Sequence, residues 1–198
     1  MASETNAVRK DDRRSIRGRV FAAPEIAAHP LVVETRIGIA GATSGDEPFV
    51  LNETDGMLDL RPPGEHARRG IRANFPPDRF SGATRHPPVR AFGKEKQSIL
   101  DVTAGLGGDA YRLAQAGHTV RAIERDAAVF ALVASAFAGG IEEGRIPKDI
   151  AARLSFEWGE GRDALDQLAP KDSAVYVDPM YPPPRRASAK PRRELQVL

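Results

Sequence analysis

The chain has 198 residues, a net charge of +2 from 29 basic and 27 acidic side chains, and no Cys. This length allows one domain, or one domain with an extension. The absence of Cys excludes disulfides, thiolate zinc sites and cysteine nucleophiles. The sequence lacks a run of about 18 apolar residues, as a membrane helix needs, and an apolar secretory signal near its start. We therefore expect a cytoplasmic protein without a membrane segment.

The small net charge conceals separate charged segments. Two segments have a negative net charge, −6 over residues 21–60 and −5 over residues 99–178. The other three have a positive net charge, +3 over residues 1–20, +6 over residues 61–98 and +4 over residues 179–198. Basic segments attract polyanions and raise encounter rates. Arg-rich loops that are merely solvated would give the same pattern, so motifs are needed to decide.

The N-terminal third predicts only short elements. Residues 1–20 are polar and without periodicity, so we expect a flexible arm. Within residues 21–61, β-type runs at 31–39, 49–53 and 57–61 predict a small antiparallel β region. An Asp-Gly pair between the last two runs indicates a hairpin turn.

Residues 62–96 hold three Pro-Pro pairs interleaved with Gly and Arg. Proline lacks an amide donor and biases its predecessor away from helix, which disfavours long regular elements. We expect a basic connector, and a connector of this length is uncommon unless it is functional or disordered.

Residues 97–198 have the pattern of an α/β domain. The β-type runs 98–105, 118–124, 154–158 and 174–178 are separated by helical segments. Strands that alternate with helices predict a parallel sheet.

The helices between these strands have recognisable ends. We expect a short helix over 109–116 and another segment over 163–168. Asp126 is a suitable N-cap for an apolar helix that ends at Gly139-Gly140. Pro147 can open a further short helix.

Three features stand at the ends of predicted strands, where ligands bind in such sheets. The first is a glycine-rich turn that begins at Asp101 and continues through Gly105, Gly107 and Gly108 to Asp109. Glycines let a ligand approach the backbone closely and adopt dihedrals closed to other residues. A tight strand-to-helix connection without a ligand would look the same.

The second feature is Glu124, which ends the second strand 19 residues after Gly105. This is near the spacing at which an acidic residue meets the ribose hydroxyls of a nucleotide-like cofactor. The third is Asp178-Pro179-Met180-Tyr181-Pro182, after the fourth strand. Its carboxylate can accept hydrogen bonds from an exocyclic amine, and its Tyr offers a stacking face to a base.

Together these features resemble class I S-adenosylmethionine (SAM)-dependent methyltransferases. The Asp178 run is similar to the (D/N)-P-P-(Y/F) signature of enzymes that methylate exocyclic nitrogens of nucleobases. The stretches DVTAGLGGDAYRLAQAGHTVRAIERDAAVFALV and VYVDPMYP resemble the RsmJ family of small-subunit ribosomal RNA guanine-N2 methyltransferases. The resemblance implies a Rossmann-like fold, SAM as cofactor, and ribosomal RNA or the small ribosomal subunit as partner.

The glycine-rich turn and the resemblance together give a cofactor-binding set drawn from four strand ends. The set is Asp101, Gly105, Gly107, Gly108, Asp109, Glu124, Arg125, Glu160, Gly161 and Asp178. The sequence departs from the family where Gly108 replaces an Arg and where Glu160-Gly161 replaces two Ser. Acidic residues near this position bond the adenine amine in many related enzymes, so Glu160 and Asp163 are both candidates.

The resemblance assigns the chemistry to the motif after the fourth strand. Asp178 would orient the target amine, Pro179 would present its carbonyl to it, and Tyr181 would stack on the base. A paired target would have to be flipped out of its helix. We expect no metal, because the four His residues show no ligand spacing.

Two basic segments are the expected RNA-facing surfaces, since Arg contacts phosphate and also stacks on unpaired bases. The basic segment 61–98 supplies Arg61, Arg68, Arg69, Arg72, Arg79, Arg85 and Arg90. The C-terminal tail supplies Arg185, Arg186, Lys190, Arg192 and Arg193.

The strand count opens alternatives. A complete domain of this class has more strands than are predicted here, so we expect a core cut short at its C-terminal end or completed by another chain. The alternatives are a methyltransferase of another nucleobase amine, such as adenine N6 in DNA or RNA, and an inactive RNA-binding remnant. A dehydrogenase is disfavoured, because the turn lacks the full G-x-G-x-x-G pattern.

Overall fold

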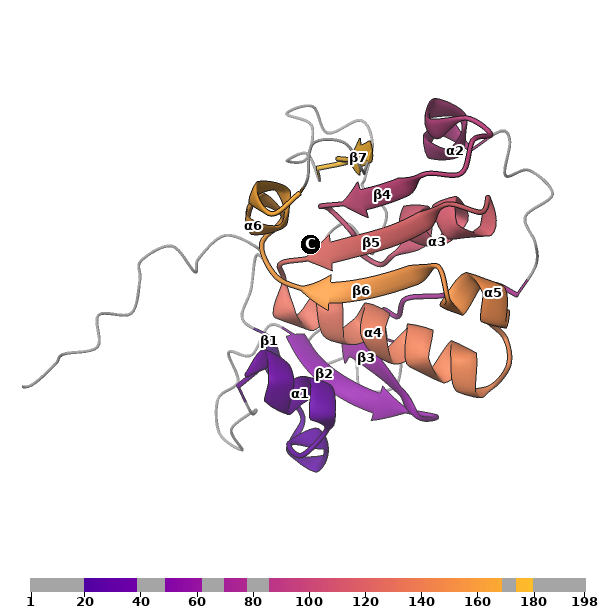
Figure 1. The fold of residues 1–198 in the computed structure, drawn as a ribbon. Coiled ribbons are helices and arrows are strands. Elements are labelled where there is room, and N and C mark those ends of the chain that lie inside the picture. Colours follow the sequence, from indigo (N-terminus) through magenta and orange to yellow (C-terminus); the bar gives the residue numbers. More distant parts are fainter. Residues whose placement is uncertain (1–19, 39–48, 62–69, 78–85, 169–173, 180–198) are drawn as a thin grey trace, which may run out of the picture.

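The computed structural model describes residues 20–38, 49–61, 70–77, 86–168 and 174–179 (Figure 1). The elements in chain order are β1 (Val20–Ala22), the 3-10 helix η1 (Pro24–Ile26), α1 (Pro30–Thr35), β2 (Phe49–Thr54), β3 (Met57–Arg61), α2 (Pro87–Phe92), β4 (Ser98–Asp101), α3 (Gly108–Gln115), β5 (Thr119–Glu124), α4 (Ala127–Glu142), α5 (Lys148–Ala151), β6 (Leu154–Trp158), α6 (Gly161–Asp166) and β7 (Ala174–Tyr176). The strands form two sheets, one of β1 to β3 and one of β4 to β7, called here sheet A and sheet B.

Sheet B confirms the predicted parallel α/β core. Its strand order is β6-β5-β4-β7, and every neighbouring pair is parallel. The carboxyl ends of parallel strands lie along one edge, which is on the left in Figure 1, beside α6. The chain runs outward from β4 to β5 and β6 and then returns to the other side of β4 as β7. Such a reversal leaves a crevice at the carboxyl edge.

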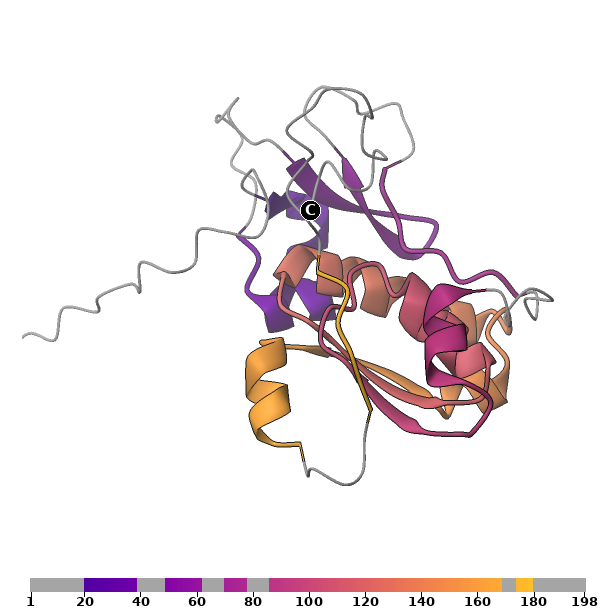
Figure 2. The same cartoon turned by 90° about the horizontal axis from the view of Figure 1, so that it is seen from above.

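The two faces of sheet B are covered differently. α3 and α4 pack on one face, with Tyr111, Leu113 and Phe130 in the buried core (Figure 2). α6 lies on the other face, over a smaller cluster that includes Leu100 and Ile123. The carboxyl edge is therefore bordered by helices from both faces.

α4 is apolar around its whole circumference because it lies between the two sheets (Figure 2). Its predicted N-cap is confirmed: Asp126 accepts from the amides of Ala128 and Val129 at 3.0 and 3.1 Å. The predicted end at Gly139-Gly140 is wrong, since the helix continues to Glu142. A Cβ on Gly140 would lie 2.7 Å from the side chain of Ile146, so this glycine lets the segment after α4 pack closely against the helix.

Sheet A confirms the predicted hairpin. β2 and β3 pair antiparallel, and both Asp55 and Gly56 have positive φ in the turn between them. β1 adds a parallel strand beside β2. The strand predicted over 31–39 is wrong, because α1 forms there. Pro30 opens that helix, and the His29 imidazole accepts from the amide of Leu31 at 3.2 Å.

Sheet A packs directly on the α/β core through α4. Leu51, Leu58 and Leu60 of the sheet share a buried cluster with Leu132 of α4. Within this contact the amide of Leu58 donates to the Ser135 hydroxyl at 3.0 Å, and both groups are buried. The predicted β region and core therefore share one packed interface.

The predicted connector contributes to the core where it is described. Phe75 is buried against Tyr111 with a ring-centroid distance of 5.0 Å, and Val89 of α2 is buried in the same core. Of the arm predicted over 1–20, residues 1–19 lie outside the described residues and Val20 begins β1. The connector parts 62–69 and 78–85 also lie outside them.

Candidate functional site

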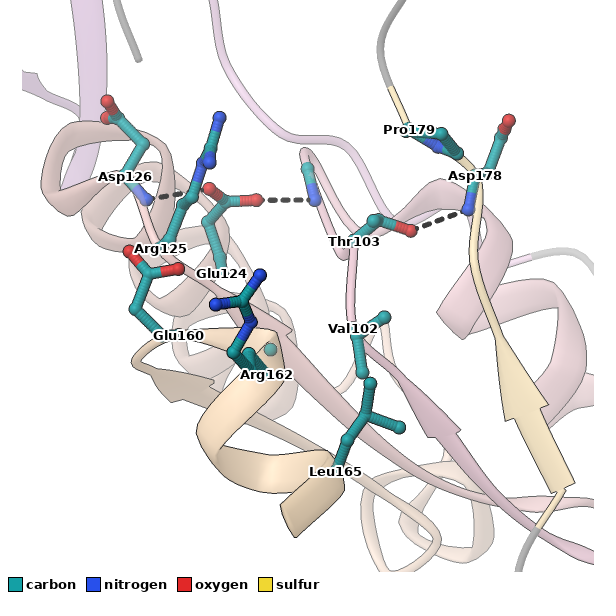
Figure 3. A pocket seen from close by; sticks show the side chains of 12 residues that line it. Val102, Thr103, Glu124, Arg125, Asp126, Glu160, Arg162, Leu165, Asp178 and Pro179 are labelled. Carbon is teal, nitrogen blue, oxygen red and sulfur yellow. Dashed lines mark hydrogen bonds between the residues drawn. The ribbon is translucent and has the colours of Figure 1, made fainter. Parts of the chain in front are cut away.

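A cavity of about 390 Å³ opens at the carboxyl edge of sheet B, next to the reversal between β4 and β7 (Figure 3). Its walls are the turn after β4, the ends of β5 and β6 with the first turn of α6, and the segment after β7. The volume falls within the range of about 300–1,000 Å³ that is usual for small-molecule sites.

Glu124 joins the turn after β4 to the start of α4. Its carboxylate accepts from the amide of Gly105 at 2.8 Å and from the amide of Asp126 at 2.7 Å (Figure 3). Gly105 makes this turn with φ +53°, in the left-handed region that favours glycine. Burial raises the pKa of Glu124, although the two amides oppose that rise. The carboxylate is thereby fixed in place on the cavity wall.

Thr103 lines the cavity beside β7 and is bonded to Asp101 at the end of β4. The carboxylate of Asp101 accepts from the Thr103 amide at 2.9 Å and from the Thr103 hydroxyl at 3.3 Å. The Thr103 hydroxyl in turn accepts from the amide of Asp178 at 2.8 Å (Figure 3). Burial raises the pKa of Asp101 to about 6, with smaller contributions from the charges of Asp109 and Glu124.

The start of α6 closes the opposite wall. Glu160 precedes the helix without a side-chain capping bond, so its carboxylate is not used by the helix end. Gly161 follows it where a Cβ would lie 2.7 Å from the carbonyl oxygen of Val102. Only glycine allows α6 to approach the turn after β4 so closely. Arg162 and Leu165 extend this wall (Figure 3).

Gly107 and Gly108 have different reasons for being glycine. Gly107 has φ +77°, and its Cβ would lie 2.7 Å from Phe156 and 2.8 Å from Val133. A Cβ on Gly108 would meet nothing within 4 Å. Gly107 thus lets the turn pack against α4 and β6, whereas Gly108 faces open space.

Asp109 is held from two sides. The Tyr176 hydroxyl donates to one carboxylate oxygen at 2.6 Å, and the Nε2 of His86 lies 3.3 Å from the other. Burial and the bond to Asp109 raise the pKa of Tyr176, so that hydroxyl stays protonated as the donor. Asp109 therefore links α2, α3 and β7 behind the cavity.

Two arginines of the expected RNA-facing set have partners within the fold. Arg61 and Arg72 pair with the fully buried carboxylate of Asp59 at 2.7 and 3.0 Å. Burial opposes ionisation, but hydrogen bonds from Arg61, Thr54 and Arg72 hold the pKa of Asp59 below its ordinary value. These two guanidinium groups therefore stabilise sheet A and the segment 70–77 that lies beside β3.

The cavity gathers most of the predicted site residues. Those on its walls are Gly105, Glu124, Arg125, Glu160, Gly161, Asp178 and Pro179. Those that lie near it without lining it are Asp101, Gly107, Gly108, Asp109 and Asp163. Tyr181, Met180 and the basic tail lie outside the described residues.

Five lining residues were not predicted from the sequence. They are Val102, Thr103, Asp126, Arg162 and Leu165. Each follows a predicted residue by one or two positions, or by one helical turn. Their position just after predicted strands could have indicated that they line the cavity. Their residue types did not single them out.

Within the ranges that the structure covers, no three His, Asp or Glu side chains are grouped so as to hold a metal ion. No helix among the described residues is both long and apolar enough to cross a membrane.

Comparison with known proteins agrees with this geometry. Residues 38–198 match a family model described as "Putative SAM-dependent methyltransferase". The ribosomal RNA small subunit methyltransferase J of Thioalkalivibrio sulfidiphilus is 33% identical to this chain over 95% of its length and 76% of that protein. The protein of the same name from Cronobacter sakazakii is 32% identical over 77% of this chain, and the match spans 64% of that protein.

A solved structure has the same fold. The SAM-dependent methyltransferase NGO1261 from Neisseria gonorrhoeae superimposes with a TM-score of 0.60 and 25% identity, covering 82% of this chain and 70% of that one. The Rossmann-like fold expected from the sequence is thereby confirmed. By its sequence match and its fold, the chain belongs to this family of SAM-dependent methyltransferases.

Proposed function

We propose that this chain transfers a methyl group from SAM to the exocyclic N2 of a guanine in the RNA of the small ribosomal subunit, in the cytoplasm. The observation that carries the proposal is that Glu124 and the Asp178-Pro179 segment line one cavity at the carboxyl edge of sheet B. The choice of ribosomal RNA rests on the relatives named ribosomal RNA small subunit methyltransferase J. The choice of guanine N2 rests on the resemblance of the Asp178 motif.

The residues of the cavity fit SAM. Each carboxylate oxygen of Glu124 accepts one hydrogen bond from a backbone amide. Each oxygen keeps a further lone pair that can accept from a ribose hydroxyl. Glu160 supplies a second carboxylate on the facing wall, suited to the amine of adenine. The positive φ of Gly105 keeps the backbone of the turn open to a ligand at this point. Gly105, Glu124, Arg125 and Glu160 would therefore hold the cofactor.

The Asp178-Pro179 segment is proposed to orient the acceptor amine. SAM supplies an electrophilic methyl group attached to a positively charged sulfur. The guanine N2 lone pair is delocalised into the ring, and acceptors that take the N2 hydrogens favour the more nucleophilic geometry. The Asp178 carboxylate and the Pro179 carbonyl are such acceptors. Because displacement depends chiefly on correct placement of the nitrogen, orientation is the main task of the chain.

RNA phosphates are proposed to meet cationic groups around the cavity. Arg125 and Arg162 line it. Arg binds phosphate through a planar fork of donors and also stacks on unpaired bases. Binding through such contacts weakens steeply as salt increases. An affinity for RNA that did not change between 50 and 200 mM salt would count against these contacts.

The experiment that tests the function is transfer of a labelled methyl group from SAM, catalysed by the full chain. The acceptors are small ribosomal subunits, free small-subunit RNA and single-stranded DNA. Nucleoside analysis is expected to find N2-methylguanosine from ribosomal RNA. N6-methyladenine instead would replace guanine by adenine as the target, and no product from any acceptor would overturn the proposal.

Two matched variants assign the site in the same assay. Asp178→Asn keeps the shape of the side chain but removes the anionic acceptor. We expect the rate of methyl transfer to fall by about 100-fold or more. Asp166→Asn changes an exposed carboxylate of α6 that does not line the cavity, so its rate should equal that of the parent.

A further inference from the structure

The last bonds between β4 and β7 lie at the edge of the cavity. The register of the two strands ends with Asp101 opposite Tyr176. One residue further on, the amide of Val102 donates to the Tyr176 carbonyl at 3.2 Å. Beyond that point the backbones are joined by a side chain, since the amide of Asp178 donates to the Thr103 hydroxyl at 2.8 Å.

The Thr103 hydroxyl has a defined direction. It carries a single hydrogen, which it donates to Asp101 at 3.3 Å, so a lone pair is left to accept from the Asp178 amide. The Asp101 carboxylate also accepts from the Thr103 amide at 2.9 Å, which fixes the backbone of Thr103. The side chain of Asp101 is buried, so bulk water does not compete for these bonds.

This chain of bonds sets where the segment after β7 begins. Asp178 and Pro179 line the cavity, but the Asp178 side chain is exposed and its backbone lies past the end of the strand ladder. Its amide has Thr103 as the acceptor across the crevice (Figure 3). A shift of about 1 Å in a group that orients the reacting atoms costs about 100-fold in rate.

We propose that Thr103 is a positioning residue that anchors the backbone of Asp178, and thereby sets where Asp178 and Pro179 lie relative to the acceptor amine. The inference rests on the proposed function for its kinetic consequence. The anchoring itself is a property of the chain without substrate and is measured separately.

The experiment compares three threonine variants of the full chain. Thr103→Val keeps the shape but neither donates nor accepts, and Thr103→Ser keeps the hydroxyl. Thr119→Val alters an exposed threonine at the opposite end of sheet B and serves as the control. Amide hydrogen exchange of Asp178, kcat with ribosomal RNA and the Kd for SAM are measured for each.

In Thr103→Val the amide of Asp178 should exchange at least about 10-fold faster, because it has lost its acceptor. The amide of Val102, which is bonded to Tyr176, should keep its protection. We expect kcat to fall about 10- to 100-fold while the Kd for SAM stays within about threefold. Thr103→Ser should restore most of the amide protection of Asp178 and most of kcat. Thr119→Val should match the parent in both.

The outcomes separate the inference from the proposed function. Parent-like exchange at Asp178 in Thr103→Val overturns the anchoring. An unchanged kcat, a Kd for SAM that rises as much as kcat falls, or no recovery in Thr103→Ser overturns the positioning role. A parent chain that methylates no acceptor rejects the proposed function, and its Asp178 exchange rates still decide whether Thr103 is the anchor.

Discussion

The carboxylate of Glu124 accepts from the amide of Gly105 at 2.8 Å, across 19 residues of sequence. Its other oxygen accepts from the amide of Asp126 at 2.7 Å, immediately before α4. One side chain thus fixes the turn after β4 and the entry to α4, and it does so at the cavity wall. A cofactor with two ribose hydroxyls needs a carboxylate to accept from them. In this chain the Glu124 carboxylate is already held in place without a ligand.

Gly107 and Gly108 should respond oppositely to substitution by Ala. Gly107→Ala puts a Cβ 2.7 Å from Phe156 at a φ of +77°. Strain and overpacking together should cost on the order of 3 kcal/mol of unfolding free energy. Gly108→Ala meets nothing within 4 Å and should stabilise the chain by about 0.5–1 kcal/mol. Urea denaturation measures both, and equal midpoints for the two variants would refute this account of the turn.

Asp101 should make stability depend on pH. Burial raises its pKa to about 6 in the folded chain, whereas an unfolded Asp titrates near pH 4. Between these values the folded state binds more protons than the unfolded state, so this contribution to stability falls as the pH rises from about 4 to 6. Asp101→Asn keeps an acceptor oxygen for Thr103 but has no such titration.

The unfolding free energy of Asp101→Asn relative to the parent should therefore increase by about 2 kcal/mol between pH 4 and pH 7. The exposed Asp166→Asn provides the comparison, and its difference from the parent should stay nearly flat. A pH-independent difference for Asp101→Asn would show that this carboxyl titrates normally in the folded chain.

Ser135 tests whether sheet A and the α/β core fold together. Ser135→Ala removes the acceptor of the buried Leu58 amide, which should cost about 1–3 kcal/mol. Ser155→Ala alters an exposed serine of β6 and should cost almost nothing. Because the two regions share one apolar cluster, both variants should unfold in a single transition. Two separated transitions in the parent would mean that sheet A unfolds independently.

The sequence predicted the strands of sheet B well, because buried parallel strands are continuous β-type runs between helices. It failed at 31–39, where a short apolar run fits a helix or a strand equally. There the cap from His29 and the proline at position 30 favour the helix. It also failed at the end of α4, since Gly140 is a contact to Ile146 and not a helix terminus.

The candidate site was predicted in part for a similar reason. Glu124 and Asp178 could be singled out because carboxylates are conspicuous at strand ends. Thr103 could not, because its significance depends on the pairing of β4 with β7, and the bond it accepts comes from 75 residues away. The burial that raises the pKa of Asp101 likewise arises only from tertiary packing.

The most direct test of the account is calorimetric titration of the full chain with SAM, using the parent, Glu124→Gln and Glu157→Gln. Glu157 pairs with Arg121 on a part-exposed face of sheet B and does not line the cavity. We predict one SAM bound per parent chain and, from the loss of a charged acceptor, about 10- to 100-fold weaker binding in Glu124→Gln. Glu157→Gln should bind as the parent does. No binding by the parent, or equal affinity in Glu124→Gln, would contradict the assignment of this cavity to the cofactor.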